Sequence, residues 1–318
     1  MQWPFVMSKK TIAKVFVSCL LCACLAACGF TGPGADQIGP PSPYAQPVVV
    51  GNINSKDITE SSGLAASRCQ ADLVWTHNDS GDGPFIFAVD TKAKVLSTYK
   101  LPNAENHDWE DIAESKDKAG KCYIFIGDIG DNDRKRPEHK IYRIAEPIVT
   151  RTEPPSNKKT PLATDAPSVL TFSYPDGNQD AETLMVNPKT GDIYVLSKRL
   201  SGPAGVYKLK PDFESGKTVV AEKVADLAVP SIPNGFLTGG DISPDGSRMI
   251  ICDYTAGYEF TLPSGAPDFD EIWKQQATVV DLGKRPSGES ITYNTDGTAL
   301  FAGSEHNNSP LIEIKRKE

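Results

Sequence analysis

The chain has 318 residues, of which 39% are apolar, 8% aromatic and 23% charged, and 33 basic against 41 acidic side chains give it a formal charge of −8. This composition excludes a disordered chain, a collagen and a polytopic membrane protein. The acidic balance also argues against a nucleic-acid partner, because binding a phosphate backbone needs clustered Lys and Arg. The 26 glycines and 25 prolines favour many short strands joined by turns.

The first 28 residues have the pattern of a lipoprotein signal peptide. Three lysines, Lys9, Lys10 and Lys14, precede an apolar run over residues 15–27, which is too short to span a bilayer. The run ends in Leu25-Ala26-Ala27-Cys28, which is similar to a bacterial lipobox. This pattern predicts that the chain is cleaved before Cys28 and that Cys28 then carries lipid, including palmitate. An ordinary cleaved signal peptide is the alternative. Loss of the three lysines would change the charge of the mature chain to −11.

The segment after the lipobox predicts a flexible tether followed by one folded domain. Residues 29–47 are rich in Gly and Pro and nearly free of charge, and residues 48–318 carry the β pattern. Gly29 replaces the aspartate that retains enteric-type lipoproteins at the inner membrane. We therefore expect a lipid-anchored monomer in the bacterial cell envelope, at the outer membrane and facing the periplasm.

Three cysteines remain once the predicted signal peptide is removed. Cys69 and Cys122 each stand just before comparable apolar strands, so they are a candidate disulfide in an oxidising compartment. Cys252 ends an apolar strand and is expected to be buried as a small hydrophobic side chain.

A repeated unit begins at five places in the predicted domain. The starts at residues 62, 110, 182, 240 and 289 are separated by 48, 72, 58 and 49 residues, and each opens a run of short β-like segments. Four-stranded units of this length are typical of a β-propeller. The last unit lacks a strand, which Val48–Ile53 would supply. We predict five blades, with residues 152–167 as a surface loop; six blades would need a further unit hidden in the 72-residue step.

The blade topology predicts two rings of polar side chains at one mouth of the central channel. In a blade, the start of the first strand and the end of the second strand share a face. The strand starts carry Ser62, Glu110, Glu182, Gly240 and Glu289, and the returning strands carry Asn78, Asp128, Lys198, Asp253 and Glu305.

Acidic side chains in one narrow channel need a compensating cation. A hard ion with oxygen ligands suits glutamates and a serine, so Ca²⁺ is the cofactor that we expect, held by Ser62, Glu110, Glu182 and Glu289 with Asp241 beside Gly240. The alternative is that Lys198 alone neutralises the cluster through ion pairs.

The five strand starts, Ser, Glu, Glu, a small residue and Glu, resemble the five-bladed propellers of the SdiA-regulated family of exported bacterial proteins. They are also similar to the calcium-activated nucleotidase (apyrase) family, in which serine and glutamate from first strands hold a central Ca²⁺. This resemblance implies the fold and the metal site, and Asn78, Asp128, Lys198 and Glu305 match the first family in kind. Gly240 departs from the serine of both families, and the nucleotidase's catalytic residues have no counterpart here.

Acidic loops and histidines surround the same predicted mouth. Residues 78–83 and 128–133 do not have EF-hand spacing, so we expect solvated hairpin loops, with a second Ca²⁺ as the alternative. His107 and His306 are weak candidates for a general base.

Together these patterns predict a lipid-anchored propeller that binds Ca²⁺ at its channel mouth and presents a face for a small ligand or an envelope protein. The alternative is a metal-dependent hydrolase of phosphate esters, carboxylic esters or lactones.

Overall fold

The computed structural model describes residues 42–150 and 155–318. The predicted signal peptide, Cys28 and the first part of the predicted tether lie outside the described residues. In the described part of the chain the structure is almost entirely β, with one short 3₁₀ helix. No helix there is long and apolar enough to cross a membrane.

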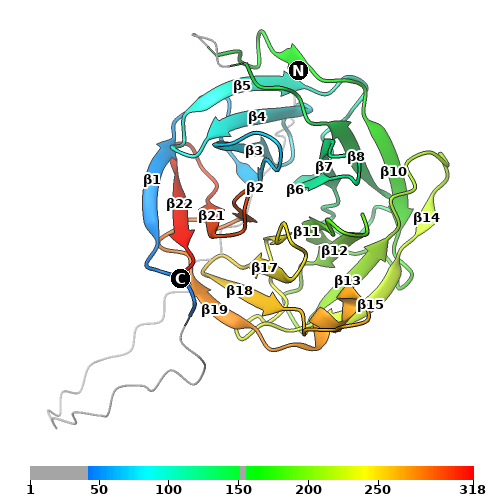
Figure 1. Ribbon diagram of the computed structural model, residues 1–318. Helices are drawn as coiled ribbons and strands as arrows, with labels where there is room; N and C mark the ends of the chain where they lie inside the picture. Colours follow the sequence, from blue (N-terminus) through cyan, green and yellow to red (C-terminus); the bar gives the residue numbers. More distant parts are fainter. Residues whose placement is uncertain (1–41, 151–154) are drawn as a thin grey trace, which may run out of the picture. The chain divides into compact units, whose positions relative to one another are not determined.

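The strands form five sheets arranged as the blades of a propeller (Figure 1). Blade 1 contains β2 (Ser61–Ala66), β3 (Leu73–Asn78), β4 (Phe85–Asp90), β5 (Val95–Lys100) and β9 (Leu162–Ala163). Blade 2 contains β6 (Trp109–Lys116), β7 (Cys122–Asp128), β8 (His139–Ala145), β10 (Ser168–Ser173) and β14 (Val219–Val220). Blade 3 contains β11 (Ala181–Val186), β12 (Ile193–Ser197), β13 (Ala204–Leu209) and β15 (Glu222–Leu227).

Blade 4 contains β16 (Gly239–Ile242), β17 (Arg248–Cys252), β18 (Ala256–Thr261) and β19 (Thr278–Asp281), with the 3₁₀ helix η1 (Phe269–Lys274) before its last strand. Blade 5 contains β20 (Ser290–Tyr293), β21 (Ala299–Gly303), β22 (Ser309–Lys315) and β1 (Val48–Ile53). The first strands of neighbouring blades contact one another in the order β2, β6, β11, β16, β20 and back to β2. The prediction of five blades is confirmed.

The N-terminal strand closes the ring, as the sequence predicts. β1 pairs antiparallel with β22 and completes blade 5. The chain packs against the propeller from before the predicted domain boundary at residue 48. Tyr44 is buried, and its hydroxyl donates to Glu259 at 2.6 Å. The last residues of the predicted tether are therefore packed against the propeller.

The predicted surface loop at residues 152–167 contains a short strand within its described part. β9 adds to blade 1 through parallel pairing with Tyr99 and Lys100 of β5. The 72-residue step thus contains the outer strands of blade 2 and this added edge strand, and the described residues of the step form no sixth blade.

Each pair of neighbouring blades encloses its own apolar cluster. Trp75 and Trp109 belong to the cluster between blades 1 and 2, and Leu184 and Tyr207 belong to the cluster between blades 2 and 3. Successive side chains of a strand point to opposite faces of the blade, and each face packs against a neighbouring blade. Strands such as β3 and β12 are therefore buried at every position. This packing fixes the blades around the axis and holds the ends of the first strands together.

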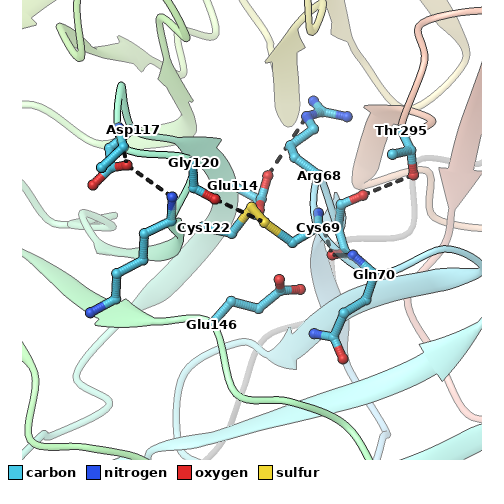
Figure 2. Close-up of a disulfide and its surroundings, with 12 residues drawn as sticks. Arg68, Cys69, Gln70, Glu114, Asp117, Gly120, Cys122, Glu146 and Thr295 are labelled. Carbon is cyan, nitrogen blue, oxygen red and sulfur yellow. Dashed lines mark hydrogen bonds and ion pairs between the residues drawn. A yellow bond between two sulfur atoms is a disulfide. The ribbon is translucent and has the colours of Figure 1, made fainter.

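A disulfide joins blades 1 and 2 at one end of the propeller (Figure 2). Cys69 lies in the turn between β2 and β3, Cys122 is the first residue of β7, and the structure confirms their predicted pairing. Arg68 reaches from the same turn towards Glu114 of β6, with its Nε 3.7 Å from a carboxylate oxygen. Cys252 is buried as a free thiol, also as expected.

Candidate metal centre at the channel mouth

Local irregularities in three first strands place the predicted site residues. The pairing register shifts between Ser61 and Leu64 in β2, on either side of Glu110 in β6, and on either side of Glu182 in β11. Such bulges leave a residue outside the ladder and redirect its side chain, and they are frequent beside functional sites. β16 and β20 pair with their neighbours without such shifts.

The mouth contains a small cavity of about 160 Å³ that is lined by polar residues from all five blades. Its walls are Ser62, Asp79, Glu110, Asn132, Glu182, Lys198, Tyr254, Glu289 and Glu305. Four of the five expected metal ligands, Ser62, Glu110, Glu182 and Glu289, are therefore brought together. Five carboxylates and one ammonium share this space, which makes it strongly anionic.

Lys198 neutralises one of these carboxylates. Its Nζ donates to both oxygens of Glu182 at 2.5 and 2.6 Å and to the Tyr254 hydroxyl at 3.0 Å. The ammonium also lies over the rings of Phe236 and Tyr254. Burial favours the neutral amine, but the pair with Glu182 outweighs it and raises the pKa of Lys198. The N–H groups of Lys198 therefore bind Glu182 and Tyr254 and form no hydrogen bond with Glu110.

Glu110 has no such partner. Its side chain is 5% exposed, and no group of the described residues forms a hydrogen bond or ion pair with its carboxylate. Burial, followed by the nearby charge of Glu182, raises the pKa of Glu110 well above its usual range. One carboxylate oxygen of Glu289 is also buried without a partner, and burial raises the pKa of Glu289 to about 7. Glu110 therefore lacks the compensation that a buried charge requires, whereas Glu289 has part of it from the charge of Lys198.

Two groups of carboxylates at the mouth have the spacing of a metal site. Asp79, Asp108 and Glu110 each offer an oxygen within 4.8 Å of the other two, and Glu110, Asp180 and Glu182 do the same. Burial, with the charge of Asp79 second, raises the pKa of Asp108 to about 6. Hard cations take carboxylate, carbonyl, hydroxyl and water oxygens, so the donor set fits such an ion.

Asp241, the fifth expected metal ligand, does not line the cavity. Its Oδ2 accepts from Arg68 at 2.7 Å, from the Thr292 hydroxyl at 2.9 Å and from the Tyr293 amide at 2.9 Å. Asp111 has the same role in blade 2, where it accepts from the Leu184 amide at 2.9 Å. Both aspartates tie neighbouring first strands together and do not line the cavity.

The second predicted ring is only partly at the cavity. Lys198 and Glu305 line it, whereas the other three side chains hold loop backbone. Asn78 accepts from the amides of residues 59 and 60, Asp128 pairs with Arg136 at 2.7 Å, and Asp253 accepts from the Ala256 amide and the Tyr258 hydroxyl. The loops therefore use these positions to fix their own shape.

Residues in the loops that follow two of the second strands line the cavity instead. Asp79 comes one residue after Asn78, and Asn132 lies in the loop after β7. Both belong to the acidic loops for which the sequence predicted solvated hairpins. The signal that could have indicated them was the acidic composition of those loops.

The two histidines proposed as bases do not line the cavity. His107 is exposed, and His306 is exposed with its Nε2 3.0 Å from the Ser287 hydroxyl.

No protein-family model matches the chain, and no curated protein matches it. Two solved structures are similar in fold. A luciferin-regenerating enzyme is 10% identical, with 85% of this chain and 95% of that chain covered and a TM-score of 0.47. A gluconolactonase from Xanthomonas campestris is 12% identical, with 85% and 89% covered and a TM-score of 0.43. These likenesses are too distant to carry any statement about the chemistry of the mouth.

Proposed function

We propose that this protein binds Ca²⁺ at the mouth of its propeller channel and uses that face to hold a small ligand or an envelope protein. The observation that carries the proposal is the carboxylate of Glu110, which is buried in the anionic cavity without a partner. Leaving a charge in this state is costly, and a cation with several oxygen ligands removes the cost. Lys198 cannot do so, because its donors bind Glu182 and Tyr254.

Thermal unfolding of the full chain tests this proposal. An ion that binds only the folded state stabilises it by about 2.7 kcal/mol when its concentration is 100 times the dissociation constant. We expect added Ca²⁺ to raise the melting temperature and a chelator to reverse the rise, with a smaller effect of Mg²⁺, which demands stricter octahedral geometry. A melting temperature that Ca²⁺ leaves unchanged would overturn the proposal.

Two matched variants assign the effect to the mouth. In Glu110→Gln the carboxylate proposed to bind the ion is lost, so the response to Ca²⁺ should vanish. Asp133→Asn is the control, because Asp133 is an exposed loop residue paired with Lys135 at 2.8 Å. The control should respond to Ca²⁺ as the wild type does.

The hydrolase alternative is tested on the same variants. Phosphate esters, carboxylic esters and lactones are offered to the full chain with Ca²⁺, Mg²⁺ or Mn²⁺. We expect no turnover, since neither candidate histidine lines the cavity. Hydrolysis that is present in the wild type and absent in Glu110→Gln would favour the enzyme.

We further propose that Cys28 carries the lipid anchor, because the lipobox pattern Leu25-Ala26-Ala27-Cys28 ends at this residue. Cys28→Ser should release the protein from bacterial membranes, and retention of this variant would contradict the anchor.

A further inference from the structure

The two carboxylate groups at the mouth share a single residue. Glu110, at the start of β6, belongs both to the group with Asp79 and Asp108 and to the group with Asp180 and Glu182. We propose that the mouth holds two cations and that the carboxylate of Glu110 bridges them. This inference rests on the proposed function, since it divides the calcium site into two positions.

Burial without partners points to a bound cation independently of the spacing. Glu110 is 5% exposed, and its carboxylate forms no hydrogen bond or ion pair in the part of the chain that the structure describes. Oε2 of Glu289, a residue of neither group, is also buried and unpartnered beside the same cavity. Both oxygens lack a donor, and buried acceptors of this kind are normally satisfied.

The first position lies on the side of blade 3. Oδ1 of Asp180 accepts from the Asp131 amide at 2.9 Å, which orients the carboxylate and leaves its other oxygen for an ion. Glu182 already binds the Lys198 ammonium. An ion at this position therefore competes with Lys198 for Glu182.

The second position lies between Asp79, Asp108 and Glu110, and no lysine of the described residues forms an ion pair with these carboxylates. A Cβ at Gly130 would collide with Oε1 of Glu110 and Oδ2 of Asp108, so the backbone of Gly130 packs directly against both carboxylates. Arg136, the cation of that loop, is taken up by Asp128 at 2.7 Å and by the carbonyl of Gly130 at 2.6 Å. The loop that contains Gly130 thus lies against two carboxylates, and its arginine, Arg136, pairs with Asp128 and not with them.

The carboxylates at the mouth, once ionised by metal binding, can balance more than one divalent ion. Seven carboxylates line the cavity or belong to the two groups: Asp79, Asp108, Glu110, Asp180, Glu182, Glu289 and Glu305. With Lys198 and one divalent ion the fully ionised site keeps a net charge of −4, and a second ion reduces it to −2. Two divalent ions about 4 Å apart that share a carboxylate are a known arrangement in proteins.

Equilibrium dialysis of the full chain against radioactive Ca²⁺ tests the inference by counting bound ions. The wild type should bind two ions per chain. Asp108→Asn and Asp180→Asn each remove one ligand from one group only, so each should bind one ion at the same free concentration. Glu110→Gln should bind none, and the exposed control Asp133→Asn should bind two.

The outcomes separate this inference from the proposed function. One ion in the wild type overturns the second position and leaves the calcium site standing, whereas no ion overturns both. A count other than one in folded Asp108→Asn also overturns the inference. Anomalous diffraction from crystals soaked in Ca²⁺ needs no variant: two peaks beside Glu110 are expected, and a single peak there overturns the second position.

Discussion

Lys198 Nζ lies 2.5 and 2.6 Å from the two carboxylate oxygens of Glu182. Glu110, which occupies the corresponding place on the neighbouring first strand, has no counter-ion among the described side chains. Equivalent positions of the repeat therefore differ in electrostatic state. One glutamate has an internal cation, and the other has none among the described residues.

The Lys198–Glu182 pair predicts opposite effects on stability and on ion binding. Lys198→Gln leaves Glu182 buried without its partner, which should lower the free energy of unfolding of the metal-free chain by about 3–5 kcal/mol. Removing the ammonium also removes a repulsive charge beside the ion, so Ca²⁺ affinity in isothermal titration should rise at least about tenfold. Lys135→Gln is the control, because that exposed lysine pairs only with exposed Asp133. Weaker binding by Lys198→Gln would show that the lysine supports the ion.

The raised pKa of Glu289 predicts a contribution to the stability of the metal-free chain that is lost as the pH rises. Burial raises the pKa of Glu289 to about 7, so the protonated form is preferred in the folded state. This contribution is complete below the usual pKa of glutamic acid and is lost as the pH rises through about 7. Between pH 6.5 and 8 in metal-free buffer, Glu289 should therefore lower the free energy of unfolding, by at most about 1.4 kcal/mol per pH unit.

The buried histidines oppose this change, and a variant separates the two contributions. Burial lowers the pKa of His77 and of His139 to about 4, so their contribution to stability is gained as the pH rises through the usual histidine pKa of about 6.5 and is nearly complete at about pH 7.5. Glu289→Gln lacks the loss caused by the carboxyl group, so from pH 6.5 to 8 without metal its stability should fall less, or rise more, than that of the wild type, and saturating Ca²⁺ should reduce the difference. Identical pH dependences of the two proteins without metal would contradict this prediction.

Gly130 predicts a loss of ion binding with every carboxylate intact. In Gly130→Ala the new methyl group would collide with the carboxylates of Glu110 and Asp108, so they must move apart. Ca²⁺ affinity measured by isothermal titration should therefore fall at least about tenfold. Gly120→Ala is the matched control for a loop glycine of the same blade with open space around it, although its positive φ of 87° costs some stability. Unchanged affinity in Gly130→Ala would mean that its loop does not shape the site.

The sequence predicted the first strands of the mouth better than its loops. Ser62, Glu110, Glu182 and Glu289 recur at the start of a repeated strand, so the closed ring brings them to one cavity whatever the loops do. Gly240 breaks the pattern, and its neighbour Asp241 could not replace it. β16 has no bulge at this point, and Asp241 binds Arg68 and the next strand instead.

Residues beyond the strands could not be placed in the same way. The positions expected for the second ring were those at the strand ends, but Asn78 and Asp128 are used to hold loop backbone and Arg136. The side chain that reaches the cavity from the first of these loops is Asp79, one residue later. Its position depends on the loop's own hydrogen bonds, which have no periodic signal in the sequence.

The disulfide predicts a stability change that is independent of the mouth. Cys69 and Cys122 are separated by 53 residues in sequence, so loss of the link frees a long loop in the unfolded chain, at a cost of about 4 kcal/mol. Cys69→Ala with Cys122→Ala should therefore lower the melting temperature by roughly 10 °C. The bridge lies where β2 has ended and β7 begins, whereas the mouth lies at the other ends of these strands, so the rise caused by Ca²⁺ should be unchanged.

Reduction of the wild type provides the matched experiment. A reductant should bring its melting temperature to that of the double variant and should have no effect on the double variant itself. Cys252→Ala, which keeps the bridge and removes the free thiol, should lose as much stability on reduction as the wild type does. If the double variant also lost its response to Ca²⁺ while remaining folded, the two ends of the propeller would be coupled through blades 1 and 2, against the separation that the strand directions indicate.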